Sequence, residues 1–231
     1  MKRLAVSVVS LFLVLCVCNF AVAFFKFSRK TSAQLNEGLY IIIDAGHGGM
    51  DGGTSAADGT LEKNINLSIA EKLNSMFKAC GFKTVMLRIN DELIGDNTLS
   101  TIRARKVSDI KTRLNIAHSY PQSILISIHQ NHYSVEKYSG AQVFYSSNSP
   151  ESKFIAQAVQ SSIVGNLQPD NNRQIKAVGT NIYLLYNCNL PSIMVECGFL
   201  SNRKETEKLK SESYQKQLAF SIVNGILNYL E

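Results

Sequence analysis

The chain has 231 residues, of which 45% are hydrophobic and 18% charged, a balance typical of a globular protein and unlike that of a disordered one. This length suits one domain with a full hydrophobic core and is short for two. The net charge of +6 is concentrated in residues 1–30, which hold five cations and no acid, so the rest of the chain has 19 cations against 18 acids. This balance argues against nucleic acid as a partner.

An apolar run follows the two basic residues at the N-terminus. Residues 4–25 carry no charge, and as a helix this run would be about 33 Å long, at roughly 1.5 Å per residue, enough to cross a bilayer. Ala21 and Ala23 also fit a signal-peptidase site, so a cleaved signal peptide and an uncleaved membrane anchor both stay open. We therefore expect residues 1–30 to export the protein and residues 31–38 to form a tether.

The remainder alternates between apolar runs and helical patterns. We expect strands at 40–44, 83–87, 123–128, 140–145 and 192–196, helices at 62–80, 107–119, 151–164 and 214–229, and a loop at 88–106. Thr60 is expected to be the N-cap of the first helix and Gly81 its C-terminal stop. Strands alternating with helices predict a single α/β domain over residues 39–231, in which helices cover both faces of a mostly parallel, twisted β-sheet.

Cysteines follow no recognisable framework in this chain. Cys80, Cys188 and Cys197 are too few and too irregularly spaced for a disulfide scaffold, and we expect them to be small buried hydrophobic residues. Cys197 follows Glu196, so strand alternation should point its thiol away from the face that carries the glutamate.

Three predicted strands end at an imidazole or an acid. The first run ends in a small-residue turn that presents His47, the run at 123–128 ends at His129, and the run at 192–195 ends at Glu196. In a parallel α/β sheet the catalytic crevice lies outside the carboxyl ends of the strands, so these groups can converge. Glu62 adds a carboxylate in the first turn of a helix, where the helix dipole favours its ionised form.

Two histidines and a glutamate form an established ligand set of hydrolytic zinc sites, in which water takes the fourth position. His47, Glu62 and His129 could provide this set, with Glu196 as a free carboxylate that takes a proton from water and returns it to the leaving amine. Each residue alone also has an ordinary interpretation, as a loop histidine or a helix-start acid, and the HExxH zinc motif is absent.

Four segments carrying these residues resemble the zinc-dependent N-acetylmuramoyl-L-alanine amidases of the amidase-3 type. They read DAGHGG at 44–49, SIHQN at 127–131, NRQIK at 172–176 and VECGFLSN at 195–202, within a resemblance that covers residues 39–231. The resemblance implies Zn²⁺ ligands at His47, Glu62 and His129 and a catalytic Glu196. It also implies hydrolysis of the amide between the lactyl group of N-acetylmuramic acid and L-alanine in peptidoglycan.

The chain is most similar to the small germination-specific amidases of the spore cortex, which prepare muramic δ-lactam. This likeness rests on the short chain, the N-terminal apolar segment and the run at 138–145. It implies action at the cell wall or in the intermembrane space of the forming spore. It leaves room for an activating protein partner and for membrane attachment through an uncleaved N-terminus.

Further residues occupy family-typical positions. Asp44, Arg113 and Arg173 are expected to have orienting or structural roles, and Asn131, Asn172 and Arg173 to contact substrate. His132 departs from the family pattern, which usually has a small residue there. We interpret it as a loop side chain beside the cleft rather than a competing metal ligand.

Two other functions stay open on the sequence. A zinc peptidase or deacylase could use the same chemistry on a related scaffold, and a catalytically silent wall-binding protein could keep the fold. Retention of all four groups argues against the silent protein, because inactive relatives commonly lose a ligand or the glutamate.

Overall fold

The computed structural model describes residues 38–231, which form one compact unit. The predicted signal or anchor at residues 1–30 and nearly all of the tether lie outside the described residues. Within the described part of the chain, no helix combines the length and the apolar character that crossing a membrane requires.

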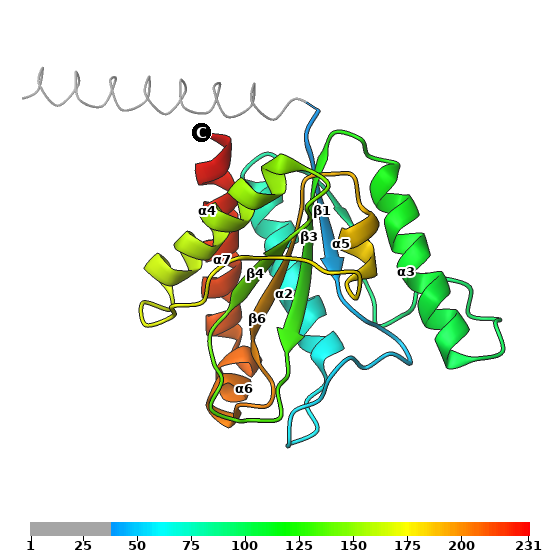
Figure 1. Ribbon diagram of the computed structural model, residues 1–231, viewed down its shortest axis with the longest axis horizontal. Coiled ribbons are helices and arrows are strands. Elements are labelled where there is room, and N and C mark those ends of the chain that lie inside the picture. The colour runs from blue at the N-terminus through cyan, green and yellow to red at the C-terminus, as the bar shows by residue number, and fades with distance from the viewer. Residues whose placement is uncertain (1–37) are drawn as a thin grey trace, which may run out of the picture. The chain divides into compact units, whose positions relative to one another are not determined.

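A six-stranded sheet in the order β2-β1-β3-β6-β4-β5 forms the centre of the unit (Figure 1). The strands are β1 (Tyr40–Ala45), β2 (Lys83–Met86), β3 (Ser123–Asn131), β4 (Gln142–Tyr145), β5 (Lys176–Ala177) and β6 (Ser192–Phe199). Four of the five pairings between these described strands are parallel, and β4 runs antiparallel to β6. The predicted single α/β domain is confirmed, and its sheet is mixed. The carboxyl ends of β1, β3 and β6 meet at one edge.

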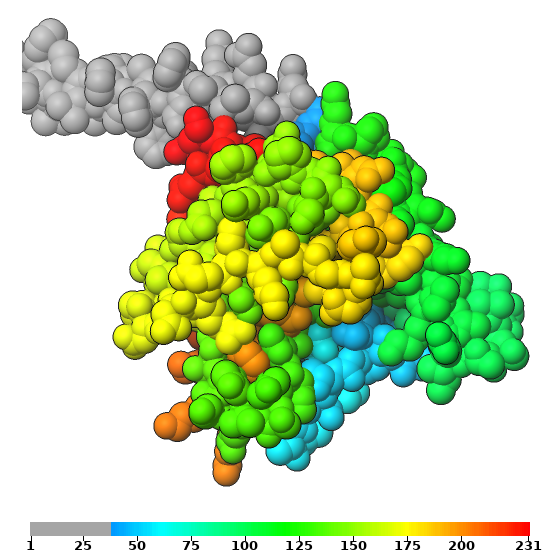
Figure 2. Space-filling model, in the orientation of Figure 1, coloured from blue at the N-terminus to red at the C-terminus, as the bar shows by residue number. Residues whose placement is uncertain are grey.

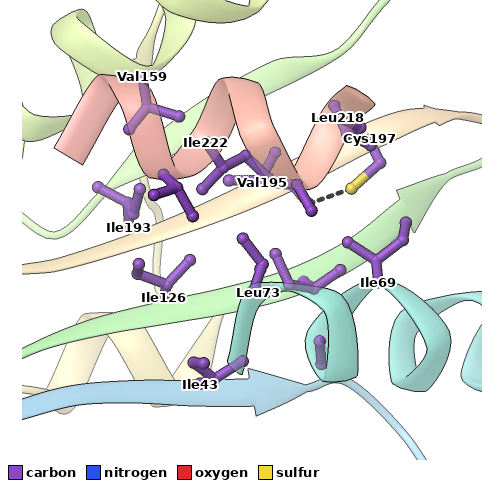
Figure 3. Close-up of a cluster of buried hydrophobic side chains, with 14 of the residues drawn as sticks. Ile43, Ile69, Leu73, Ile126, Val159, Ile193, Val195, Cys197, Leu218 and Ile222 are labelled. Atoms are coloured by element: carbon purple, nitrogen blue, oxygen red, sulfur yellow. Dashed lines mark hydrogen bonds between the residues drawn. The ribbon is translucent and has the colours of Figure 1, made fainter. Parts of the chain in front are cut away.

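Helices cover both faces of the sheet. One face packs against α2 (Glu62–Ala79), α4 (Pro150–Asn166) and α7 (Glu212–Leu230), and the other against α3 (Ile102–His118) and α5 (Tyr183–Asn187). Alternation along β1 explains why both faces are apolar, because Ile41 and Ile43 join the first layer and Ile42 joins the second. Figure 3 shows the first layer, in which Ile43, Ile126, Ile193 and Val195 of the sheet pack against Ile69, Leu73, Leu218 and Ile222.

The structure corrects several local predictions. Leu61 rather than Thr60 occupies the N-cap of α2, and its side chain makes no capping hydrogen bond. Helix α3 begins at Ile102, within the predicted 88–106 loop, because Thr101 accepts a hydrogen bond from the Ala104 amide. Helix α6 (Arg203–Lys210) was not predicted; its N-cap is Asn202, whose side chain accepts from the Glu205 amide. Gly81 has φ +88°, which confirms it as the stop after α2.

The cysteine predictions are confirmed in part. Cys188 and Cys197 are buried, but Cys80 is exposed, because it lies at the end of α2 beyond the last turn that faces the core. Cys197 belongs to the main apolar cluster, whereas Glu196 lines a cavity at the sheet edge. The two side chains therefore point to different faces of β6, as alternation predicts. Burial raises the pKa of the Cys197 thiol, which keeps it protonated and unsuited to be a nucleophile.

Two helical glycines give a matched test of the packing between α4 and α7. A Cβ on Gly225 of α7 would lie 2.5 Å from Cα of Val159 on α4, whereas a Cβ on Gly165 would meet nothing within 4 Å. Gly225→Ala should therefore lower the free energy of unfolding by about 1–3 kcal/mol through overpacking. Gly165→Ala should leave it unchanged or raise it by up to about 1 kcal/mol, since alanine is the better helix former. Urea unfolding measures both, and equal stabilities would contradict the close α4–α7 contact.

Candidate metal centre and active site

The loop after β1 presents His47 in a left-handed conformation with φ +64°, which L-residues other than glycine seldom adopt. Two buried arginines hold this loop through its carbonyl oxygens. Arg113 donates to the carbonyls of Ala45 and His47, at 2.8 Å each. Arg88 donates to those of Ala45 at 2.8 Å and Gly46 at 3.1 Å. These bonds offset the strain of the turn, which is on the order of 1–3 kcal/mol for such a conformation.

Arg113 is itself fixed by buried carboxylates. Its guanidinium donates to Asp44 at 2.5 Å and to Asp109 at 2.7 Å, and the Ser127 hydroxyl donates to the second oxygen of Asp44 at 2.6 Å. Burial alone would raise the pKa of Asp44, but Arg113 beside it and the Ser127 hydrogen bond hold that pKa below its usual value. The structure thus places the predicted orienting pair, Asp44 and Arg113, directly beneath the His47 loop.

Arg88 was not singled out by the sequence analysis. It also donates to the carbonyls of Lys63 and Asn90, so it links the His47 loop, the first turn of α2 and the segment after β2. Burial and then the nearby Arg113 lower its pKa, yet a guanidinium stays charged. One signal was present in the sequence, namely a lone arginine directly after the predicted strand at 83–87, which ends at the same side of the sheet as the predicted strand at 40–44.

The three predicted metal ligands converge. His47 Nε2 lies 3.3 Å and His129 Nδ1 3.0 Å from the same oxygen of Glu62, and the three ligand atoms lie within 4.8 Å of one another. Backbone amides fix the Glu62 carboxylate, with Thr54 donating to one oxygen at 2.9 Å and Gln130 to the other at 3.0 Å. The cluster is formed at the carboxyl ends of β1 and β3 and at the N-terminus of α2.

Neighbouring glycines leave room for these side chains. A Cβ on Gly53 would lie 2.5 Å from the Glu62 carboxylate and 2.7 Å from the His47 ring, and a Cβ on Gly46 would lie 2.3 Å from the His129 ring. Two imidazoles and one carboxylate are the donor types that suit a borderline divalent metal. The residues present therefore fit a metal ion.

The electrostatics of the cluster favour a cation. Burial would lower the pKa of His47, but hydrogen bonds to Asp51 and Glu62 outweigh it and raise that pKa to about 9. Burial likewise opposes ionisation of Glu62, yet its bonds to His129 and His47 hold its pKa far below the usual range. In the metal-free protein a proton on His47 thus compensates two carboxylates, and binding of a metal would release that proton.

Asp51 orients His47. Its carboxylate lies 2.9 Å from His47 Nδ1, which leaves Nε2 to face the centre of the cluster, and its other oxygen pairs with Lys106 at 2.9 Å. A carboxylate in this position fixes the tautomer of a ligand histidine and raises its basicity. Among the described residues, Asp51 is therefore the side chain placed to orient His47.

Glu196 lies beside the cluster on β6, in register with His129 on β3. With His47 and His129 it lines a cavity of about 390 Å³, whose other walls come largely from α3 and α5. One of its oxygens is buried and has no hydrogen-bond partner among the described residues. Burial raises its pKa to about 7, although nearby His129 opposes the shift. A carboxyl group that titrates near neutrality is suited to both accepting and returning a proton.

Comparison with known proteins identifies the family. The family described as N-acetylmuramoyl-L-alanine amidase matches residues 41–228, which contain all four of these groups. The chain belongs to this family. Over 192 residues it is 33% identical to the germination-specific N-acetylmuramoyl-L-alanine amidase of Bacillus subtilis, covering 83% of this chain and 80% of that protein.

Solved structures of related enzymes share the fold. The CwlD amidase of Clostridioides difficile, in complex with the GerS lipoprotein, is 37% identical with a TM-score of 0.80, covering 83% of this amidase and 98% of that chain. The amidase AmiC2 of Nostoc punctiforme is 29% identical with a TM-score of 0.69, covering 83% of this amidase and 97% of that chain. The similarity therefore extends along nearly the whole length of these solved amidase chains.

The remaining predicted residues of the amidase do not belong to the three-residue cluster. Asn131 is half-buried at the end of β3, and Asn172 is exposed. The Arg173 guanidinium lies 4.9 Å from the centre of the Phe199 ring. His132 is exposed and does not belong to the three-residue cluster.

Removal of Asp51 should weaken metal binding without unfolding the amidase. Asp51→Ala deprives His47 Nδ1 of its acceptor, so the affinity for Zn²⁺ should fall about 10–100-fold. Asp58→Ala is the matched control, because Asp58 pairs with Lys210 at an exposed site. Chelator competition measures both affinities. Equal affinity of the two variants would show that Asp51 does not orient the ligand.

Glu196→Gln should stabilise the metal-free amidase at pH 8 but not at pH 4. The pKa of Glu196 is raised from 4.5 to about 7 in the folded state. Its contribution to stability is therefore complete below pH 4.5 and is lost as the pH rises through 7. A neutral glutamine avoids this loss, which amounts to at most about 3 kcal/mol at pH 8. Urea unfolding of both proteins in the presence of a chelator measures the difference in their free energy of unfolding. A difference that does not change with pH would contradict the raised pKa.

Proposed function

We propose that this amidase binds Zn²⁺ through His47, Glu62 and His129 and uses Glu196 as its catalytic proton carrier. Its reaction would be hydrolysis of the amide between the lactyl group of N-acetylmuramic acid and L-alanine. The observation that carries the proposal is the convergence of the ligand atoms within 4.8 Å, beside a cavity that His47, His129 and Glu196 share. Family membership supports the same bond as the target.

The side chains divide the chemistry between them. When bound, zinc polarises the scissile carbonyl and makes water nucleophilic near neutral pH. Glu196 takes the proton from the attacking water and delivers it to the nitrogen of L-alanine, which then leaves as an amine. Asp51 holds His47 in one tautomer, and the two arginines hold the loop, so the site needs little rearrangement during the reaction.

Spore-cortex peptidoglycan is the substrate we propose, with muramic δ-lactam formed in a later step from the bared muramic acid. Support comes from similarity to the germination-specific enzyme of Bacillus subtilis and to CwlD. The CwlD structure contains the GerS lipoprotein, and by analogy we propose that a protein partner activates this amidase. We further propose that residues 1–30 direct export, that residues 31–38 form the tether, and that residues 39–231 are the catalytic domain acting outside the cytoplasmic membrane.

Ligand and proton-carrier variants test the assignment. His47→Ala and His129→Ala should lose both bound zinc and activity, whereas Glu196→Gln should keep zinc and lose activity by about 10²–10⁴-fold. His132→Ala is the matched control, because His132 is exposed beside His129 and should keep zinc. Metal analysis and product analysis on peptidoglycan provide the readouts. The products should be bare muramic acid and stem peptides that begin with L-alanine.

Stoichiometric zinc in His129→Ala, or its loss in His132→Ala, would refute the ligand assignment. Cleavage inside the stem peptide, or release of acetate, would instead identify a peptidase or a deacylase.

A further inference from the structure

The loop between β3 and β4 presents two aromatic rings next to the active-site end of the sheet. Tyr133 is 52% exposed and Tyr138 39% exposed. Their ring centroids lie 4.8 Å apart in an edge-to-face arrangement, and Tyr138 stacks on the buried Phe199 at 6.3 Å with an interplanar angle of 30°. We call Tyr133, Tyr138 and Phe199 the aromatic shelf. Exposed rings gathered in this way indicate a binding surface.

The aromatic shelf is held in place by hydrogen bonds to the segment after β6. The Tyr133 amide donates to the Ser201 hydroxyl at 3.1 Å, and the Asn202 side chain donates to the Tyr138 carbonyl at 3.2 Å. The exposure of the two tyrosines is therefore a feature of an anchored loop. Rigid aromatic side chains offer contact area at a low entropic cost of binding.

The shelf adjoins Glu196. Phe199 lies three residues after Glu196, and the Arg173 guanidinium covers its ring at 4.9 Å. Arg173 also donates to the Gln142 side chain at 2.5 Å, and Gln142 is in register with Glu196 across the β4–β6 pair. Among the described residues, Nε of Arg173 is buried and has no hydrogen-bond acceptor. A polar donor thus lies between the shelf and the reacting carboxyl.

The surface around the shelf joins three segments. Figure 2 shows the green atoms of the β3–β4 loop beside the cyan atoms of the segment after β1 and the orange atoms after β6. Residues from all three segments, such as Ala57, Glu136 and Ser201, line one hollow there. The cavity at Glu196 is bounded instead by α3 and α5. The hollow beside the shelf and the cavity at Glu196 are therefore separate surfaces, with no lining residue in common.

The chemistry of the substrate indicates which part of it the aromatic shelf would bind. The scissile amide has a peptide on its amine side and, one lactyl group away on its acyl side, a sugar ring. Pyranose rings present C–H faces that pack on aromatic rings, and their hydroxyl and N-acetyl groups accept from donors such as Arg173 and Lys137. Lys137 Nζ lies 5.7 Å from the centre of the Tyr138 ring. We propose that the aromatic shelf binds the N-acetylated sugars that flank the cleaved muramic acid in the glycan strand, an inference that rests on the proposed function.

Two readouts on the full-length chain test the shelf. The first is the Kd, from saturation-transfer NMR, for a peptide-free tetrasaccharide of alternating N-acetylglucosamine and N-acetylmuramic acid. The second is hydrolysis of peptide-bearing glycan strands compared with N-acetylmuramoyl dipeptide. Tyr133→Ala and Tyr138→Ala should each raise the Kd, and the KM for strands, about two- to tenfold. Neither should change kcat, or hydrolysis of the dipeptide, which lacks the neighbouring sugars.

Three further variants keep the test decisive. Tyr133→Phe and Tyr138→Phe retain the rings and should keep most of the binding, which guards against misfolding of the alanine variants. Phe220→Ala removes a ring that is 56% exposed on α7 and should change nothing. Unchanged Kd and KM in both alanine variants, with wild type cleaving both substrates, would overturn the shelf and leave the proposed function standing. Tetrasaccharide binding that depends on the shelf, with strands cut inside the stem peptide or with acetate released, would refute the proposed function alone.

Discussion

The site depends on hydrogen bonds from two buried guanidinium groups to the carbonyl oxygens of residues 45–47. Arg88 and Arg113 donate these bonds. A left-handed histidine is costly in isolation and persists only where its surroundings fix it. Arg113 supplies that support from α3, and Arg88 supplies it from the segment after β2. The resulting turn aims His47 at Glu62 and His129, which belong to other elements. Burying charge is expensive, so Asp44 and Asp109 are needed to neutralise Arg113.

Charge at the site is arranged in two zones. Around His47, Glu62 and His129, hydrogen bonds join the carboxylates and the imidazoles, and this arrangement favours a bound cation. A short distance away, Glu196 is buried with one oxygen unpaired, and its pKa rises to about 7. An unpaired buried carboxylate destabilises a fold, so its presence is best explained by the reaction. One cavity therefore combines histidines of a side-chain set that fits a metal ion with a carboxyl group suited to exchange protons.

Much of this could be predicted from the sequence because the signals are local. Apolar runs that end at His47, His129 and Glu196 place these residues at strand ends, and the topology of a parallel sheet brings them together. Hydrogen-bond partners that lie far apart in the chain could not be predicted from the sequence. Arg88 bonds to carbonyls of Ala45 and Gly46, more than 40 residues away in the chain, and no motif records this. Helix α6 was missed because it is short and mostly charged, so its apolar periodicity is weak.

The central claim is that one metal ion sits between His47, Glu62 and His129, with Glu196 nearby but free. Anomalous diffraction at the zinc edge, from crystals of the zinc-loaded protein, tests it most directly. The account predicts a single peak in contact with side-chain atoms of His47, Glu62 and His129, and a Glu196 carboxylate that faces the peak without binding it. A peak coordinated by Glu196 or by His132, or no peak at this cluster in zinc-loaded protein, would contradict the account.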